Sequence, residues 1–260
     1  MPITPPELQR ELLWLTALGS GLLLILAMAL AVAESPPFAL RWLPLSLGCW
    51  AFVAWQCLRR LHRNRATEDN AIYGSLGHGT RITLLRGLLI AATAGFLATI
   101  GMQTQAALLF LPALFYTTAA LGDALDGYVA RRQRQTTHLG AELDTSLDAL
   151  GLLIAPLLAV AYGKLHVSYL LVSAAYYLFQ WGLHWRRKHG KAVYPLPPSR
   201  LRRHLAGLQM ALVATVLWPP LPADVTRLAG VIFMLPMLFG FWRDWLHVSG
   251  RRRSDREPAA

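Results

Sequence analysis

Long unbroken runs of apolar residues are the feature that most restricts what this chain can fold into. A helix that crosses the hydrocarbon core of a bilayer needs about 20 mostly apolar residues, and the sequence contains about eight such runs. They cover approximately residues 12–33, 38–58, 82–101, 106–130, 140–162, 165–183, 205–221 and 228–248. Hydrophobic residues make up 55% of the chain and charged residues 15%. We therefore expect an all-α integral membrane protein with about eight transmembrane helices.

The first run has one feature of a cleavable signal peptide. It ends in the small-residue sequence AVA at residues 31–33, which resembles a signal-peptidase site. Its apolar stretch is longer than the usual core of about 7–15 residues, and the segment before it is not clearly basic. We therefore expect the first helix to be retained.

Basic residues are concentrated in alternate loops. The formal net charge is +11, and the Lys and Arg residues gather near residues 58–65, 131–138, 185–204 and 251–256. The loops on the other side contain only Arg41, Lys164 and Arg227. Because cytoplasmic loops are enriched in Lys and Arg, this asymmetry places both termini in the cytoplasm, and we expect a bacterial inner-membrane location. Contact with anionic lipid headgroups accounts for the charge, so no nucleic-acid partner is expected.

The composition also divides the chain into parts. Residues 1–66 are expected to form an accessory transmembrane hairpin, and residues 67–79 a polar linker. Residues 80–248 hold the acidic residues of interest and are expected to form a catalytic membrane domain of six helices. Residues 249–260 form a basic cytoplasmic tail.

Four aspartates lie at regular spacing in the stretch GDALDGYVARRQRQTTHLGAELDTSLD. They are Asp123, Asp126, Asp144 and Asp148. The first two are three residues apart and the last two are four residues apart, so each pair shares one face of a helix. The short basic turn between the pairs predicts two antiparallel neighbouring helices. A charged side chain at the centre of a spanning helix costs about 2.5–3.5 kcal/mol, so we expect these carboxylates to face a wet cavity at the cytoplasmic end and to be paired with cations.

The residue types around the aspartates restrict the chemistry. Arg131 and its neighbours are the only protein cations that the sequence predicts beside them. Carboxylate ligands without sulfur or imidazole select a hard divalent ion such as Mg²⁺, Mn²⁺ or Ca²⁺, and four of them have room for two ions that act on a phosphoryl group. Gly127, Ala130 and Gly140 allow close approach of a bound group or, equally, of a neighbouring helix. Arg131 lies on the face of Gly127 and is placed to reach a diphosphate.

Together these residues spell D-x2-D-G-x2-A-R-x8-G-x3-D-x3-D. The pattern resembles the signature of the CDP-alcohol phosphotransferases, integral-membrane enzymes with a six-helix core, and it is complete at every specified position. The resemblance also includes Thr83 and Arg86, which are similar to a Thr-x2-Arg pair of the first core helix. The N-terminal hairpin lies outside the resemblance.

The resemblance implies a role for each residue of the motif. Asp123, Asp126, Asp144 and Asp148 would hold two Mg²⁺ or Mn²⁺ ions, and Asp148 would also act as the general base on the acceptor hydroxyl. Residues around the nucleotide and its diphosphate would be Gly127, Ala130, Arg131 and Gly140. The implied reaction transfers a phosphatidyl group from CDP-diacylglycerol to a small alcohol and releases CMP. A homodimer is also implied.

The acceptor alcohol is less well determined by the sequence. Arg200, Arg202 and Arg203 lie in a loop that in such enzymes binds a phosphate on the acceptor, which makes glycerol 3-phosphate the first candidate. Positive-inside topology explains the same arginines equally well. Gln209 resembles a residue of phosphatidylglycerophosphate synthases, whereas Ala149 and its surroundings are closer to serine- or inositol-type relatives.

Two other functions fit parts of the pattern. An aspartate-lined bundle is also expected of a divalent-cation transporter, which would not need the Gly, Ala and Arg positions. Intramembrane prenyltransferases also use aspartate-rich helices with Mg²⁺, but their acidic motifs lie in distant helices. Cys49 and Cys57 lie within a single apolar run, which indicates small apolar residues and not a disulfide framework or a zinc site.

Overall fold

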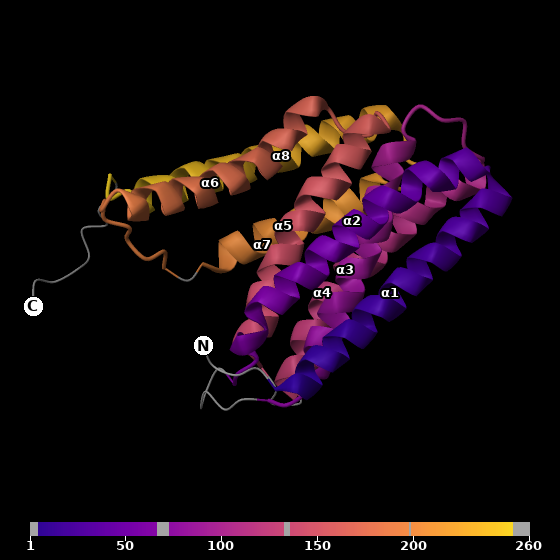
Figure 1. Ribbon diagram of the computed structural model, residues 1–260. Helices are drawn as coiled ribbons and strands as arrows, with labels where there is room; N and C mark the ends of the chain where they lie inside the picture. Colours follow the sequence, from indigo (N-terminus) through magenta and orange to yellow (C-terminus); the bar gives the residue numbers. More distant parts are fainter. Residues whose placement is uncertain (1–4, 67–72, 133–135, 198, 252–260) are drawn as a thin grey trace, which may run out of the picture.

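The computed structural model describes residues 5–66, 73–132, 136–197 and 199–251, without the side chain of Arg131. Within these residues the chain folds into eight α-helices (Figure 1). They are α1 (Pro6–Ala33), α2 (Pro36–Arg60), α3 (His78–Gly95), α4 (Phe110–Arg132), α5 (His138–Ala161), α6 (Leu170–Lys188), α7 (Arg200–Val216) and α8 (Ala223–Val248). Four short 3-10 helices join them, η1 (Leu61–Arg63), η2 (Phe96–Thr99), η3 (Ala106–Leu109) and η4 (Val167–Tyr169). The all-helical fold class is confirmed.

Six of the eight helices are long and apolar enough to cross a membrane. They are α1 to α5 and α8, some with their flanking 3-10 turns. By the same measure α6 and α7 do not qualify, although the sequence predicts spans there. The last residues of α6 are Arg186, Arg187 and Lys188, and α7 has only 17 residues and begins with arginines. Many large apolar side chains on α1 and α8 are exposed, as expected for surfaces that face lipid.

The N-terminal helices α1 and α2 form the expected hairpin. Ser35 begins α2 as its N-cap, because its hydroxyl accepts a hydrogen bond from the backbone N–H of Phe38. Trp50 of α2 donates from Nε1 to the backbone carbonyl of Thr16 in α1 at 3.0 Å. The hairpin then packs through α2 against α3. Cys49 and Cys57 are free, and both lie within α2 as small apolar residues.

Helix α3 is the central helix of the bundle. It packs against α2, α4 and α5, and most of its residues are buried. Its many Gly, Ala and Thr residues permit this close packing, because small side chains let helix backbones approach one another in membranes. By contrast, α4 and α5 contact each other at few residues, so α3 joins them although the sequence predicts direct neighbours.

The C-terminal helices α6, α7 and α8 follow the bundle, and α6 and α7 pack against α4 or α5. Figure 1 shows α6 and α8 side by side, pointing away from the bundle of α1 to α5 toward the loop between α6 and α7. Gln209 of α7 is buried and joins three elements, because it accepts from the hydroxyl of Tyr169 and donates to the backbone carbonyl of Phe233 at 2.6 Å. These two hydrogen bonds give Gln209 a structural role between the C-terminal helices.

Candidate functional site

The four aspartates converge on one buried arginine of α3. The guanidinium of Arg86 contacts all four carboxylates, which come from α4 and α5. Nη1 lies 2.7 Å from Asp126 Oδ2 and 2.5 Å from Asp144 Oδ1, and Nη2 lies 2.7 Å from Asp123 Oδ1 and 2.8 Å from Asp148 Oδ1. The prediction that the two acidic pairs face one another is confirmed, with Arg86 between them.

Burial differs among these five charged groups. The side chain of Arg86 is 2% exposed and that of Asp126 is 7% exposed, whereas Asp123, Asp144 and Asp148 are each about one-third exposed. One guanidinium balances one negative charge, so three carboxylate charges remain without a counter-charge among the described side chains that contact them. A site of this composition attracts further cations.

Backbone and hydroxyl groups of neighbouring helices hold Arg86 and Asp126 in place. Arg86 Nε donates to the carbonyl of Ala119 at 3.2 Å. The Thr83 hydroxyl lies 3.0 Å from both Asp126 Oδ2 and the Gly79 carbonyl, and it donates to one of them at a time. Because Thr83 and Arg86 are one turn apart on α3, they contact the same aspartate.

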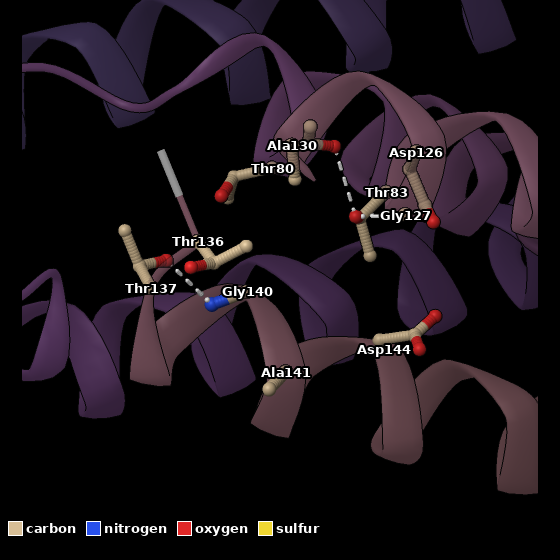
Figure 2. A pocket seen from close by; sticks show the side chains of 11 residues that line it. Thr80, Thr83, Asp126, Gly127, Ala130, Thr136, Thr137, Gly140, Ala141 and Asp144 are labelled. Atoms are coloured by element: carbon tan, nitrogen blue, oxygen red, sulfur yellow. Dashed lines mark hydrogen bonds between the residues drawn. The ribbon is translucent and has the colours of Figure 1, made fainter. Parts of the chain in front are cut away.

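A cavity of about 210 Å³ opens beside these carboxylates (Figure 2). It lies between α3, α4 and α5 where α4 and α5 separate, and Thr136 and Thr137 complete its wall. Its lining comprises Gly79, Thr80, Thr83, Asp126, Gly127, Ala130, Thr136, Thr137, Gly140, Ala141 and Asp144. Small side chains and hydroxyl groups therefore surround an open space at the edge of the acidic cluster.

Glycine and threonine residues shape this cavity. A side chain at Gly79 would place its Cβ 2.9 Å from the Cβ of Ala130, so glycine there permits the approach of α3 and α4. Thr137 is the N-cap of α5, because its hydroxyl accepts from the backbone N–H of Gly140 at 3.0 Å. The first turn of α5 is therefore fixed where it borders the cavity.

The acidic cluster fits a divalent metal ion. Asp123, Asp126 and Asp144 each offer one carboxylate oxygen, and these oxygens all lie within 4.8 Å of one another. All of the donors are hard oxygen atoms, which Mg²⁺ and Mn²⁺ prefer. Asp148 contacts the same guanidinium and extends the set along α5.

The structure brings most of the motif residues together. Gly127, Ala130 and Gly140 all line the cavity, and their role around a nucleotide stays a prediction. The side chain of Arg131 lies outside the described residues, so its predicted contact with a diphosphate stays a prediction. Thr83 and Arg86 contact the aspartates directly.

The three arginines of α7 have different surroundings. Arg202 Nη1 lies 3.2 Å from the buried Asp244 of α8, and its Nη2 donates to the Pro197 carbonyl at 2.5 Å. This arginine therefore joins α7 to α8. Arg200 and Arg203 are exposed and form no ion pair with any described residue. None of the three lines the cavity beside the aspartates.

The shared cation of the site, Arg86, has a larger role than the sequence predicts. Arg131 and its neighbours are the cations that the sequence places near the acids, whereas the structure places Arg86 in contact with all of them. The signal was its position inside an apolar run, because a charged residue there needs a partner. Thr80, Thr136 and Thr137 were also not predicted, since hydroxyl residues at helix starts are common caps.

The family profile described as CDP-alcohol phosphatidyltransferase matches residues 79–242. A "CDP-diacylglycerol--glycerol-3-phosphate 3-phosphatidyltransferase" of Mycoplasma pneumoniae (strain ATCC 29342 / M129 / Subtype 1) is 29% identical over 164 residues. The alignment covers 61% of this chain and 66% of that relative, slightly less than two thirds of its length. No solved structure matches the chain.

Proposed function

The chain belongs to the CDP-alcohol phosphatidyltransferase family, and from this premise we propose that it transfers a phosphatidyl group from CDP-diacylglycerol to a small alcohol and releases CMP. One observation supports this most strongly. Four carboxylates from two helices surround one buried arginine at the edge of a cavity that small residues line. The alternative functions, a divalent-cation transporter and a prenyltransferase, are disfavoured because the family match covers the helices that carry the four aspartates.

The donor is expected to bind in the cavity between α3, α4 and α5. Gly79, Gly127 and Ala130 leave room for the nucleotide beside the carboxylates, and the hydroxyls of Thr80 and Thr137 offer hydrogen bonds to it. Arg131 is proposed to contact the diphosphate, because it follows Ala130 on α4. The acyl chains of the donor would extend into the bilayer from this site.

The four aspartates are proposed to hold two divalent ions, Mg²⁺ or Mn²⁺. Asp123, Asp126 and Asp144 have converging oxygens, and Asp148 adds a fourth carboxylate. When bound, such ions supply positive charge that neutralises the diphosphate and favours departure of CMP. Arg86 keeps the carboxylates close together, since it contacts each of them.

Asp148 is proposed to act as the general base. Its carboxylate is partly exposed beside the cluster, and it accepts the proton of the acceptor hydroxyl. The acceptor oxygen then forms a bond to the phosphorus that carries the diacylglycerol. The bond from that phosphorus to the bridging oxygen breaks, and its electron pair leaves with CMP.

Glycerol 3-phosphate is the proposed acceptor. The name of the Mycoplasma pneumoniae relative includes this substrate, and Arg200 and Arg203 are exposed cations on the first turn of α7. Arg202 is less suited, because Asp244 and the Pro197 carbonyl already occupy its guanidinium. A homodimer in the bacterial inner membrane, with the site and both termini in the cytoplasm, completes the proposal.

The test is release of CMP by purified protein in lipid–detergent micelles with CDP-diacylglycerol, Mg²⁺ and a panel of alcohols. We expect release with glycerol 3-phosphate, loss of release in EDTA, and recovery with Mg²⁺ or Mn²⁺. The variant Arg227→Gln serves as a matched control, because Arg227 donates from Nε to the Gly163 carbonyl at the other end of the bundle. Release of CMP that is unaffected by EDTA would contradict the metal proposal.

A further inference from the structure

The N-terminal hairpin packs along the catalytic helices through α2, and some of its polar contacts lie at the end where the cavity lies. The family match begins at residue 79, so α1 and α2 lie outside it. Two groups of polar contacts nevertheless join the hairpin to two of the three helices that border the cavity, α3 and α5. These contacts suggest what the hairpin does.

The first group joins α1 to the start of α3 through Glu11. Glu11 Oε2 accepts from the backbone N–H of Leu76 at 2.9 Å. Its Oε1 lies 2.7 Å from Nη2 of Arg81 and also accepts from Nε at 2.9 Å. Leu76 precedes α3, and Arg81 directly follows Thr80, which lines the cavity. Glu11 therefore fixes the first turn of α3 on both sides of the lining residues Gly79 and Thr80.

The second group joins the end of α2 to the start of α5 through Glu142. Arg60 Nε lies 3.3 Å from Glu142 Oε2, and Arg63 of η1 binds the other oxygen of the same carboxylate. Glu142 directly follows the lining residue Ala141. Both oxygens of one carboxylate are thus bound by arginines of the hairpin.

Backbone contacts continue this second connection. The N–H of His138 donates to the Arg65 carbonyl at 3.1 Å. Ala66 forms an isolated antiparallel bridge with Thr137, the N-cap of α5 that lines the cavity. The backbone that follows η1 therefore contacts the cavity wall directly beside Glu142.

Asn64 joins the two groups. Its buried side chain donates from Nδ2 to the carbonyls of Tyr73 and Ser75, at 3.1 and 3.0 Å. The backbone carbonyl of Asn64 accepts from the backbone N–H of Tyr73 at 3.1 Å. The segment that leads into α3 is therefore held to the segment that contacts α5.

We infer that the hairpin is a positioning element for the donor cavity, with Glu11 and the Arg60–Arg63–Glu142 cluster setting the separation of α3 and α5. Exposed ion pairs contribute little to the free energy of unfolding, so these pairs are not expected to serve mainly to stabilise the fold. Their placement matters because α4 and α5 have few direct contacts, so the width of the cavity depends on the elements that hold these two helices, and these links lie directly beside the cavity. The inference rests on the proposed function, since the donor is taken to bind in this cavity.

Three variants with one matched control test the inference. Glu11→Gln and Glu142→Gln each remove the negative charge and one acceptor oxygen of one link, and Arg60→Gln/Arg63→Gln removes the positive charges of the second link. Glu34→Gln is the control, because Glu34 makes a similar bond from the hairpin to the N–H of Gln105, at 3.0 Å, near the opposite end of the bundle. The KM for CDP-diacylglycerol, the KM for the acceptor, kcat and the melting temperature are measured for each protein.

We expect the KM for the donor to rise about 5- to 20-fold in the three link variants, less than the roughly 100-fold that a 1 Å misplacement can cost. Acceptor KM, kcat at saturating donor and melting temperature should stay close to those of Glu34→Gln. Combining Glu142→Gln with Arg60→Gln/Arg63→Gln should add no further change, because both remove the same contact. If Glu142→Gln is not recovered as folded protein, Arg63→Gln, which alters a half-exposed side chain, replaces it.

The outcomes separate the inference from the proposed function. Wild-type protein that releases no CMP would contradict the proposed function. Active wild-type protein whose donor KM is unchanged in Glu11→Gln and Glu142→Gln would overturn the positioning role alone. An equal rise of donor KM in Glu34→Gln would also overturn it, because the effect would then not depend on the end of the hairpin that borders the cavity.

Discussion

Arg86 determines how four carboxylates can lie close together inside a membrane protein. It is almost completely buried, and it contacts Asp123, Asp126, Asp144 and Asp148. Without it the carboxylates would repel one another in a medium of low dielectric constant. Replacement of one partner of a buried ion pair commonly costs about 3–5 kcal/mol, because the other charge is left uncompensated.

We therefore expect Arg86→Gln to lower the melting temperature in EDTA and to abolish CMP release. Mg²⁺ should raise the melting temperature of this variant more than that of the wild type, because a bound cation replaces part of the missing charge. Thermal unfolding in EDTA and in Mg²⁺ checks this, with Arg227→Gln as the arginine control. Equal Mg²⁺-induced shifts in variant and wild type would show that Arg86 does not balance the metal ligands.

Asp123 and Asp148 should respond differently to removal of their charge. Asp148→Asn is expected to reduce kcat about 10²- to 10⁴-fold, the usual contribution of a general base, with a smaller change in donor affinity. Asp123→Asn should weaken binding of metal and donor together, because a neutral amide is a poor ligand for a hard divalent ion. Titrations of Mg²⁺ and of donor separate the two, and an equal loss of donor affinity in both would argue against the base role.

At the scale of elements, the approach of α3 to α4 controls the cavity. The Cβ of an alanine at Gly79 would lie 2.9 Å from the Cβ of Ala130 and 3.2 Å from the Asp126 carbonyl. Gly79→Ala is therefore expected to push the two helices apart, at a cost of about 1–3 kcal/mol, and to raise the KM for the donor. Gly21→Ala in α1 is the control, because no atom outside its own helix backbone or its chain neighbours lies within 4 Å of the added Cβ. A Gly79→Ala variant as stable and active as Gly21→Ala would exclude this packing role.

Helix α7 offers a second prediction at this scale, on the acceptor. A charge-assisted hydrogen bond contributes about 1.5–3 kcal/mol, so Arg200→Gln or Arg203→Gln should raise the KM for glycerol 3-phosphate roughly tenfold or more. Donor KM should not change. Arg202→Gln should mainly lower the melting temperature, because it removes one of the two arginine partners of the buried Asp244. Unchanged acceptor kinetics in the Arg200 and Arg203 variants would leave topology as their role.

At the scale of the whole molecule, the alternating loops predict the orientation in the membrane. Starting from a chain without Cys49 and Cys57, single cysteines are introduced at Gln103, between η2 and η3, and at Lys191, after α6. Both positions are exposed. A membrane-impermeant maleimide applied to intact expressing cells should label Gln103→Cys, whereas Lys191→Cys should react only after permeabilisation. The reverse pattern would place the candidate site on the outer face.

Much of the site followed from sequence because helix geometry is local. The spacing of Asp123 with Asp126 and of Asp144 with Asp148 places each pair on one face whatever the rest of the chain does. Long apolar runs likewise predict spanning helices, because a bilayer requires about 20 such residues. The same reasoning was less accurate for α6 and α7, where it predicted spanning helices. Helix α6 ends in three basic residues, and α7 has only 17 residues.

Contacts between segments far apart in the chain were decided only by the tertiary structure. Arg86 lies 58 and 62 residues before Asp144 and Asp148, and no local spacing relates them. Glu142 lies two residues before Asp144 in the sequence, yet its carboxylate binds arginines of the hairpin. A motif records which residues share a helix face, whereas the packing of α3 between α4 and α5 determines which charge neutralises them. The sequence by itself therefore determined the membrane class and the acidic pairs, and tertiary packing determined their shared cation and the contacts that border the cavity.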